Sequence, residues 1–137
     1  MNAEGKTFPD SKKNFATLPP NIAGTWYCTE YANDGSVFET STLELSSDGH
    51  AVATTKGGTA WFTSAEGDWK YNRVGADGFV NVSVIHETSS GSWSAKNFNG
   101  KVDNLENPSR VEGTATRSSG TNMGGGNPYV YKLVMTR

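Results

Sequence analysis

The chain has little that would support disulfide or metal chemistry. Cys28 is the single cysteine among 137 residues, so an intramolecular disulfide is excluded. The two histidines, His50 and His86, are far apart in the sequence and have no Cys or His neighbours at metal-ligand spacing, which argues against a structural zinc. We therefore expect no metal and no cofactor.

Long apolar runs and an excess of one charge are also missing. No window approaches the roughly 18 apolar residues of a membrane-spanning helix, and the N-terminus lacks the apolar stretch of a signal peptide. The net charge is −2, from 12 basic and 14 acidic residues, so nothing would attract nucleic acid or an anionic membrane. We expect a soluble protein, cytoplasmic or secreted with its signal peptide removed, whose partners are neither nucleic acids nor membranes.

The residues that are abundant favour β-structure. Aromatic residues make up 11% of the chain and glycine occurs 16 times, a balance typical of short strands joined by tight turns. No helical period of useful length is present, and turn sequences such as Asn33-Asp34-Gly35-Ser36 recur at short intervals. The predicted strands cover residues 22–31, 37–45, 50–56, 59–64, 67–74, 78–88, 92–102, 110–117 and 129–136.

The run 59–64 is short enough to extend a neighbouring strand, which leaves eight main strands. We predict an all-β protein, an eight-stranded antiparallel up-and-down β-barrel over residues 22–137, because closure removes exposed sheet edges. The alternative is an open sheet or a two-sheet β-sandwich. Residues 1–21 are polar and proline-containing, and form either a flexible leader or, through Phe8, Phe15 and Leu18, a lid over the barrel mouth.

The sequence Ile-Ala-Gly-Thr-Trp-Tyr at residues 22–27 resembles the first strand of the avidin and lipocalin-like barrels, grouped as calycins. The last residues, 133–137, are similar to their closing strand. The resemblance implies that Trp26 plugs one end of the barrel and that Arg137, or else Arg117, packs over its indole. It does not extend to biotin binding, because Cys28 and Glu30 are unsuited to gripping a ureido group.

Strand alternation predicts which side chains point into the lumen. If Trp26 points inward then so do Cys28 and Glu30, and on the next strand the same argument selects Glu39. A Glu39–Arg73 ion pair would satisfy two inward charges. Each aromatic side chain alone suits ordinary core packing, but together the set resembles an amphipathic ligand site. The predicted ligand-binding residues are Glu30, Glu39, Trp69, Tyr71, Arg73, Trp93 and Tyr131.

Four other features have two interpretations each. Val80, Val82 and Val84 are either core residues or an outward stripe that would mediate a homodimer or homotetramer. The glycine-rich segment 118–128 is either a surface connection or a mouth loop. His86 is better suited to a structural role than to proton transfer, and Cys28 to packing rather than nucleophilic attack.

These features lead to two expectations for function. The first is binding of a small, partly hydrophobic or amphipathic molecule in the lumen. The second is a cofactor-independent isomerase or cyclase, similar to allene oxide cyclase or the small polyketide and natural-product cyclases, that folds a flexible substrate inside the barrel. No nucleophile elbow or paired-carboxylate signature identifies catalytic residues, which stay unknown at this stage.

Overall fold

The structure, a computed structural model, describes residues 22–58, 64–121, 124–125 and 129–137, and within that range it consists of β-strands, turns and loops. No helix in this part of the chain is long and apolar enough to cross a membrane. The strands are β2 (Gly24–Tyr31), β3 (Val37–Leu45), β4 (His50–Gly58), β5 (Ser64–Val74), β6 (Asp77–Glu87), β7 (Trp93–Val102), β8 (Arg110–Thr121), β9 (Gly124–Gly125) and β10 (Tyr129–Thr136).

Eight of these strands form a closed antiparallel barrel. Each strand from β2 to β8 pairs with the next one along the chain, and β10 pairs with both β8 and β2. The closing strand matches Tyr129–Thr136 to Arg110–Arg117 on one side and Lys132–Thr136 to Tyr27–Tyr31 on the other. The predicted fold is confirmed, and the open sheet and the sandwich are wrong.

The bounds of the predicted strands differ from the structure mainly at two places. Strand β8 continues to Thr121, so the first part of the predicted loop 118–128 is strand, and Gly124–Gly125 form the short strand β9 against it. Of the predicted strand 59–64, Ser64 begins β5 and residues 59–63 lie outside the described residues. The leader 1–21 lies outside them as well.

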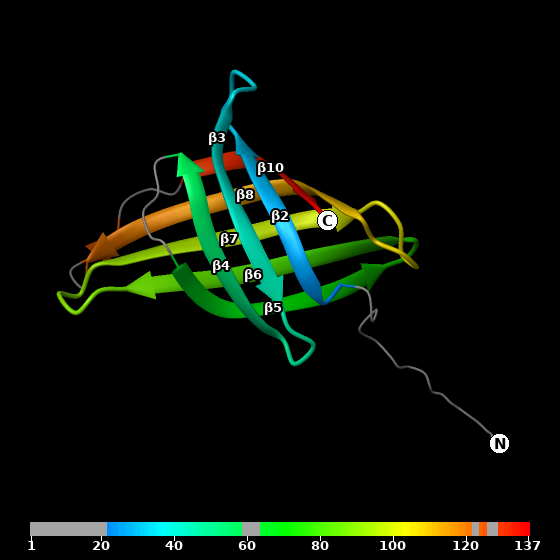
Figure 1. Cartoon of the computed structure of the whole chain (residues 1–137), viewed down its shortest axis with the longest axis horizontal. Helices are drawn as coiled ribbons and strands as arrows, with labels where there is room; N and C mark the ends of the chain where they lie inside the picture. The colour runs from blue at the N-terminus through cyan, green and yellow to red at the C-terminus, as the bar shows by residue number, and fades with distance from the viewer. Residues whose placement is uncertain (1–21, 59–63, 122–123, 126–128) are drawn as a thin grey trace.

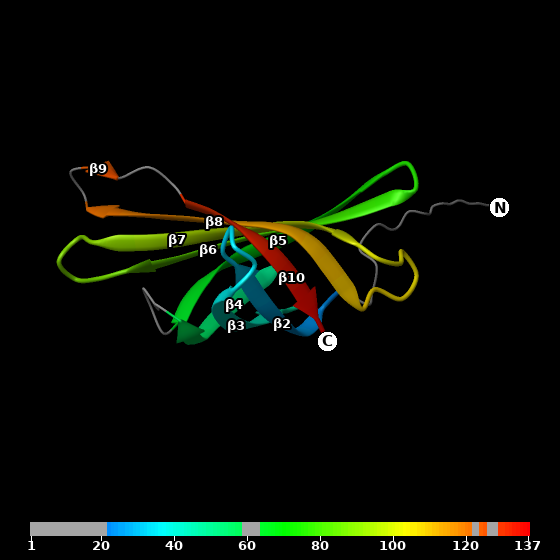
Figure 2. The same cartoon turned by 90° about the horizontal axis from the view of Figure 1, so that it is seen from above.

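The barrel is flattened into two crossing layers. Figure 1 shows β2, β3 and β4 passing in front of the longer strands β5 to β8 at a steep angle. In Figure 2 the same two groups lie one above the other, and β10 runs from one to the other. Side chains from both layers therefore meet across a narrow interior.

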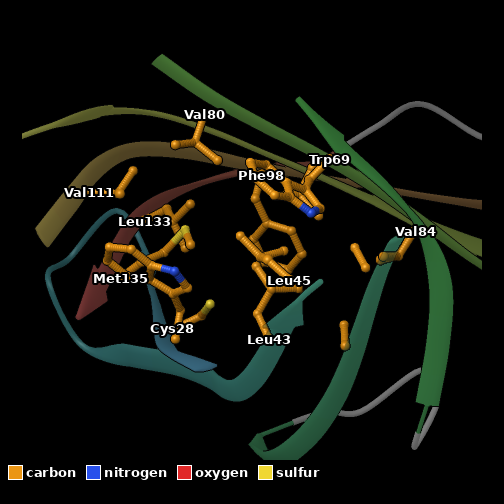
Figure 3. Packing of buried hydrophobic residues seen from close by; sticks show 14 of the residues in the cluster. Cys28, Leu43, Leu45, Trp69, Val80, Val84, Phe98, Val111, Leu133 and Met135 are labelled. Carbon is orange, nitrogen blue, oxygen red and sulfur yellow. The ribbon is translucent and has the colours of Figure 1, made fainter. Parts of the chain in front are cut away.

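Strand alternation places the apolar side chains in that interior. Trp26 is fully buried, and its indole N–H donates to the carbonyl of Ile22 at 2.9 Å. Figure 3 shows Cys28, Leu43 and Met135 among the side chains that converge between the strands. We call the region around Trp26 the Trp26 end. There, Gly24 at the start of β2 pairs with Leu45 at the end of β3.

The valines of β6 belong to the core. Val80, Val82 and Val84 are each 0–2% exposed, so they do not form an outward stripe. Their inward position removes the reason for predicting a dimer or tetramer through this strand. His86 follows them in phase and is half-buried, with Nδ1 lying 3.1 Å from the carbonyl oxygen of Ser64.

A buried charged cluster as candidate functional site

Four charged side chains lie inside the barrel, away from the Trp26 end. Glu30, Glu39, Lys96 and Arg117 are each at most 1% exposed, and we refer to them as the charged cluster. Glu30 on β2 lies directly opposite Glu39 on β3, and Lys96 on β7 lies directly opposite Arg117 on β8. The cluster therefore joins an acidic pair from one layer to a basic pair from the other.

The two pairs are linked by ion pairs across the interior. The Lys96 ammonium contacts Glu30 Oε2 and donates to Glu39 Oε1 at 3.2 Å. Arg117 Nη2 lies 2.7 Å from the same Glu39 oxygen. Because charged side chains are seldom fully buried without paired partners, this connectivity explains how the barrel tolerates four of them.

One oxygen of each carboxylate is not used by these contacts. Glu30 Oε1 and Glu39 Oε2 are buried and have no hydrogen-bond partner among the described residues. The Thr55 hydroxyl is in the same situation, on β4 beside β3. Buried polar atoms without a partner are costly, so both carboxylate oxygens would be stabilised by a hydrogen-bond donor.

An aromatic pair borders the cluster. The rings of Phe38 and Tyr131 stack with centroids 4.3 Å apart and planes inclined by 12°. The Arg117 guanidinium carbon lies 5.0 Å from the Phe38 centroid and 5.9 Å from the Tyr131 centroid. Both rings are half-buried, so an apolar, partly exposed surface lies beside the buried cluster.

Two β-bulges lie beside the acidic pair. The register between β2 and β3 shifts after Glu30, where Phe38 is the extra residue, and the register between β3 and β4 shifts after Glu39. A bulge bends its strand and re-aims a side chain, and bulges are common beside functional sites. Here the bulge at Phe38 allows that side chain to reach Arg117 although the neighbouring Glu39 also points inward.

Burial shifts the pKa of two groups on β2, Glu30 and Cys28, in the same direction. Desolvation raises the pKa of Glu30 above its usual range, and the nearby Lys96 ammonium opposes this shift. Burial raises the pKa of the Cys28 thiol to about 12. Cys28 is therefore a protonated packing residue and not a nucleophile at neutral pH.

The structure separates the predicted ligand-binding residues into two groups. Glu30, Glu39 and Tyr131 lie together at the charged cluster. Trp69 lies toward the Trp26 end, where its indole N–H donates to the carbonyl of Ser46 in the β3–β4 turn at 2.7 Å. Trp93 begins β7 in the phase opposite to Lys96, and its indole N–H donates to the carbonyl of Thr121 at 3.3 Å.

The predicted Glu39–Arg73 ion pair is wrong. Arg73 is exposed near the β5–β6 hairpin, where its Nε donates to the carbonyl of Gly75 at 3.1 Å. Tyr71, which precedes it in the same phase, packs partly buried against the core beside Gly78. The prediction failed because strand alternation gives a side chain's face and not its height along the barrel.

Lys96 and Arg117 were missed as site residues. The prediction for β7 places the phase of Trp93 inward, whereas the inward phase contains Lys96, Phe98 and Val102. For β8 the signal was present, because Val111 and Ala115 are apolar and share a face with Arg117. A cation that shares a strand face with two apolar residues is expected to point inward, and this pattern would have identified Arg117 as a residue of the interior.

Arg137, and not Arg117, covers the Trp26 indole. Its guanidinium carbon lies 4.3 Å from the ring centroid. Its Nε and Nη2 donate to the carbonyl of Pro108, and Nη1 donates to the carbonyl of Ala23 at 3.1 Å. This end of the barrel is thus closed by an aromatic plug and a fixed cation.

No group of three or more His, Cys, Asp or Glu side chains within the described ranges is arranged to hold a metal ion. Comparison with known proteins adds no family to this description: no protein-family model, no curated protein and no solved structure matches the chain. The fold and the charged cluster are therefore the observations from which function must be argued.

Proposed function

We propose that the protein binds a small, partly hydrophobic molecule inside the barrel, with the polar part of the molecule at the charged cluster. The observation that carries this proposal is the pair of buried carboxylate oxygens, Glu30 Oε1 and Glu39 Oε2, that have no partner among the described residues. A barrel stabilised only by its core would gain from apolar residues at these positions. A bound molecule that donates hydrogen bonds would give both oxygens a partner.

Two further features support binding at this place. The half-buried Phe38 and Tyr131 rings offer apolar contact area beside the charges, the combination typical of small-molecule sites. Some eight-stranded barrels hold one small ligand in the interior, whereas others are filled by side chains. The resemblance of residues 22–27 to the calycin barrels, many of which bind ligands, agrees with this proposal.

A thermal-shift screen across aromatic, fatty and polyketide-like compounds tests the proposal. We expect at least one compound to raise the melting temperature and to quench tryptophan fluorescence, since a ligand that binds only the folded state stabilises it. The same compound should bind more weakly to a Glu39→Gln variant. The matched control is Glu44→Gln, because Glu44 is exposed on the same strand and should leave binding unchanged.

The absence of any stabilising compound, or equal binding to the Glu39→Gln and Glu44→Gln variants, would contradict the proposal. Circular dichroism of each variant separates lost binding from lost folding, and Glu30→Gln serves as a second variant at the cluster.

The second candidate is a cofactor-independent isomerase or cyclase, of the allene oxide cyclase or polyketide cyclase kind. It is favoured by Glu30, whose raised pKa and contact with Lys96 suit a group that holds or transfers a proton. The same screen distinguishes an enzyme from a binding protein. If the protein is an isomerase or cyclase, incubation with a binding compound should give a new chromatographic peak, and mass spectrometry should show that this product has the mass of the starting compound. Compounds recovered unaltered favour the binding protein.

A further inference from the structure

Glu30 and Glu39 each keep one buried carboxylate oxygen without a hydrogen-bond partner among the described residues. The two residues are directly opposite each other on β2 and β3, and both side chains point inward. Their other oxygens are bound by cations, Glu30 Oε2 by Lys96, and Glu39 Oε1 by Lys96 and Arg117. This cross-strand pair therefore offers two acceptor oxygens on side chains whose other oxygens are bound by cations.

The charges of the cluster select against a charged ligand. Two carboxylates and two cations sum to zero when all four are ionised, and all are removed from water. An anionic ligand would meet the carboxylate oxygens, or would have to separate Glu39 from Arg117 and Lys96. A cationic ligand would leave a net positive charge in a buried place, which desolvation makes costly. A neutral donor avoids both costs.

The apolar border of the cluster favours a flat body on that ligand. Phe38 and Tyr131 present stacked, half-buried rings beside Arg117. Aromatic rings pack well against a planar partner, by offset stacking or edge-to-face contact.

We propose that the site takes a neutral molecule with a flat apolar body and a head group carrying two adjacent N–H or O–H donors, such as a primary amide or a diol. Glu30 Oε1 and Glu39 Oε2 accept from that head group. The inference rests on the proposed function and names its ligand class. Because both oxygens are buried, binding displaces the side chains that cover them.

Four probes of nearly the same shape test the head group: benzamide, N,N-dimethylbenzamide, benzoate and benzamidinium. Dissociation constants come from ligand-observed NMR and tryptophan fluorescence titrations of the full chain. We expect benzamide to bind best, and the dimethylated amide to bind at least about tenfold more weakly, because it lacks both donors to charged acceptors. Benzoate and benzamidinium should be weaker by a similar factor.

Variants connect the preference to the two carboxylates. Glu39→Gln and Glu30→Gln should reduce the ratio between benzamide and its dimethylated form several-fold, and Glu44→Gln should leave the ratio unchanged. If a cluster variant fails to fold, the probe series on the unmodified chain decides.

Equal affinity for benzamide and the dimethylated amide, or tighter binding of benzoate or benzamidinium, would overturn the ligand class and leave lumen binding intact. Failure of all four probes would also overturn it, while the broader compound screen decides separately on the proposed function.

Discussion

Lys96 links the two carboxylates of the charged cluster. Its ammonium contacts both carboxylates, and it is 1% exposed. Removing one partner of a buried ion pair leaves an uncompensated charge in the interior, whereas an exposed pair is screened by water. Lys101 on the same strand forms an exposed ion pair for comparison, with its Nζ 3.1 Å from Oδ1 of Asp77 on β6.

We expect Lys96→Met to lower the free energy of unfolding by about 3–5 kcal/mol, because Glu30 and Glu39 would lose their shared cation. Lys101→Met should change it by less than about 1 kcal/mol. Urea unfolding followed by circular dichroism measures both values. Adding Glu30→Gln to Lys96→Met should recover part of the loss, and equal effects of the two single variants would contradict the electrostatic role of Lys96.

At the scale of the element, close approach of strands β7 and β8 shapes the barrel. Gly100 and Gly113 lie directly opposite each other, and a Cβ atom on Gly113 would be 1.8 Å from the carbonyl oxygen of Asn99. No side chain fits there without moving the backbone. Glycine at this position therefore permits the tight packing of β7 against β8, on the same strand as Arg117 of the charged cluster.

We expect Gly113→Ala to lower the free energy of unfolding by at least about 1 kcal/mol, because the added methyl group meets backbone atoms and not a flexible side chain. Thr114→Ala, at the exposed neighbouring position, should cost less than about 1 kcal/mol. Thermal and denaturant unfolding of both variants provide the comparison. A Gly113→Ala variant as stable as the unmodified chain would show that β7 and β8 can separate at no cost.

For the whole molecule, closure controls access to the interior. Strand β10 joins β8 to β2, so Cys28 on β2 is enclosed and its thiol is 1% exposed. Reagents that need a thiolate meet two barriers, burial itself and a pKa raised by that burial to about 12. Cys28 therefore reports on opening of the barrel.

We expect Cys28 to react with Ellman's reagent at least about a hundredfold more slowly than an exposed thiol, and faster as denaturant is added, because reaction requires opening. The control is Ser47→Cys in a Cys28→Ala background, since Ser47 is exposed in the β3–β4 turn. Stopped-flow absorbance measures the rates. Labelling of Cys28 as rapid as that of the control would contradict a barrel that is closed in solution.

Local pattern was sufficient for much of the fold. Turn sequences and alternation predicted the eight strands of the barrel. The phase of Trp26 predicted that Glu30 points inward, and the more apolar phase of the next strand predicted the same for Glu39. These are properties of residues close in sequence, because alternation has a period of two and turns need particular residues. The same information could not show that Arg73 lies far from Glu39.

The sequence by itself determined the strands, their order and which carboxylates face inward, since each depends on local backbone geometry. Only the tertiary structure decided which cations meet them. Lys96 and Arg117 are 57 or more residues from Glu39 along the chain and reach it because the flattened barrel brings β7 and β8 against β2 and β3. Strand stagger, the bulge at Phe38 and the crossing of the two layers set those distances, and they arise from packing of the whole sheet.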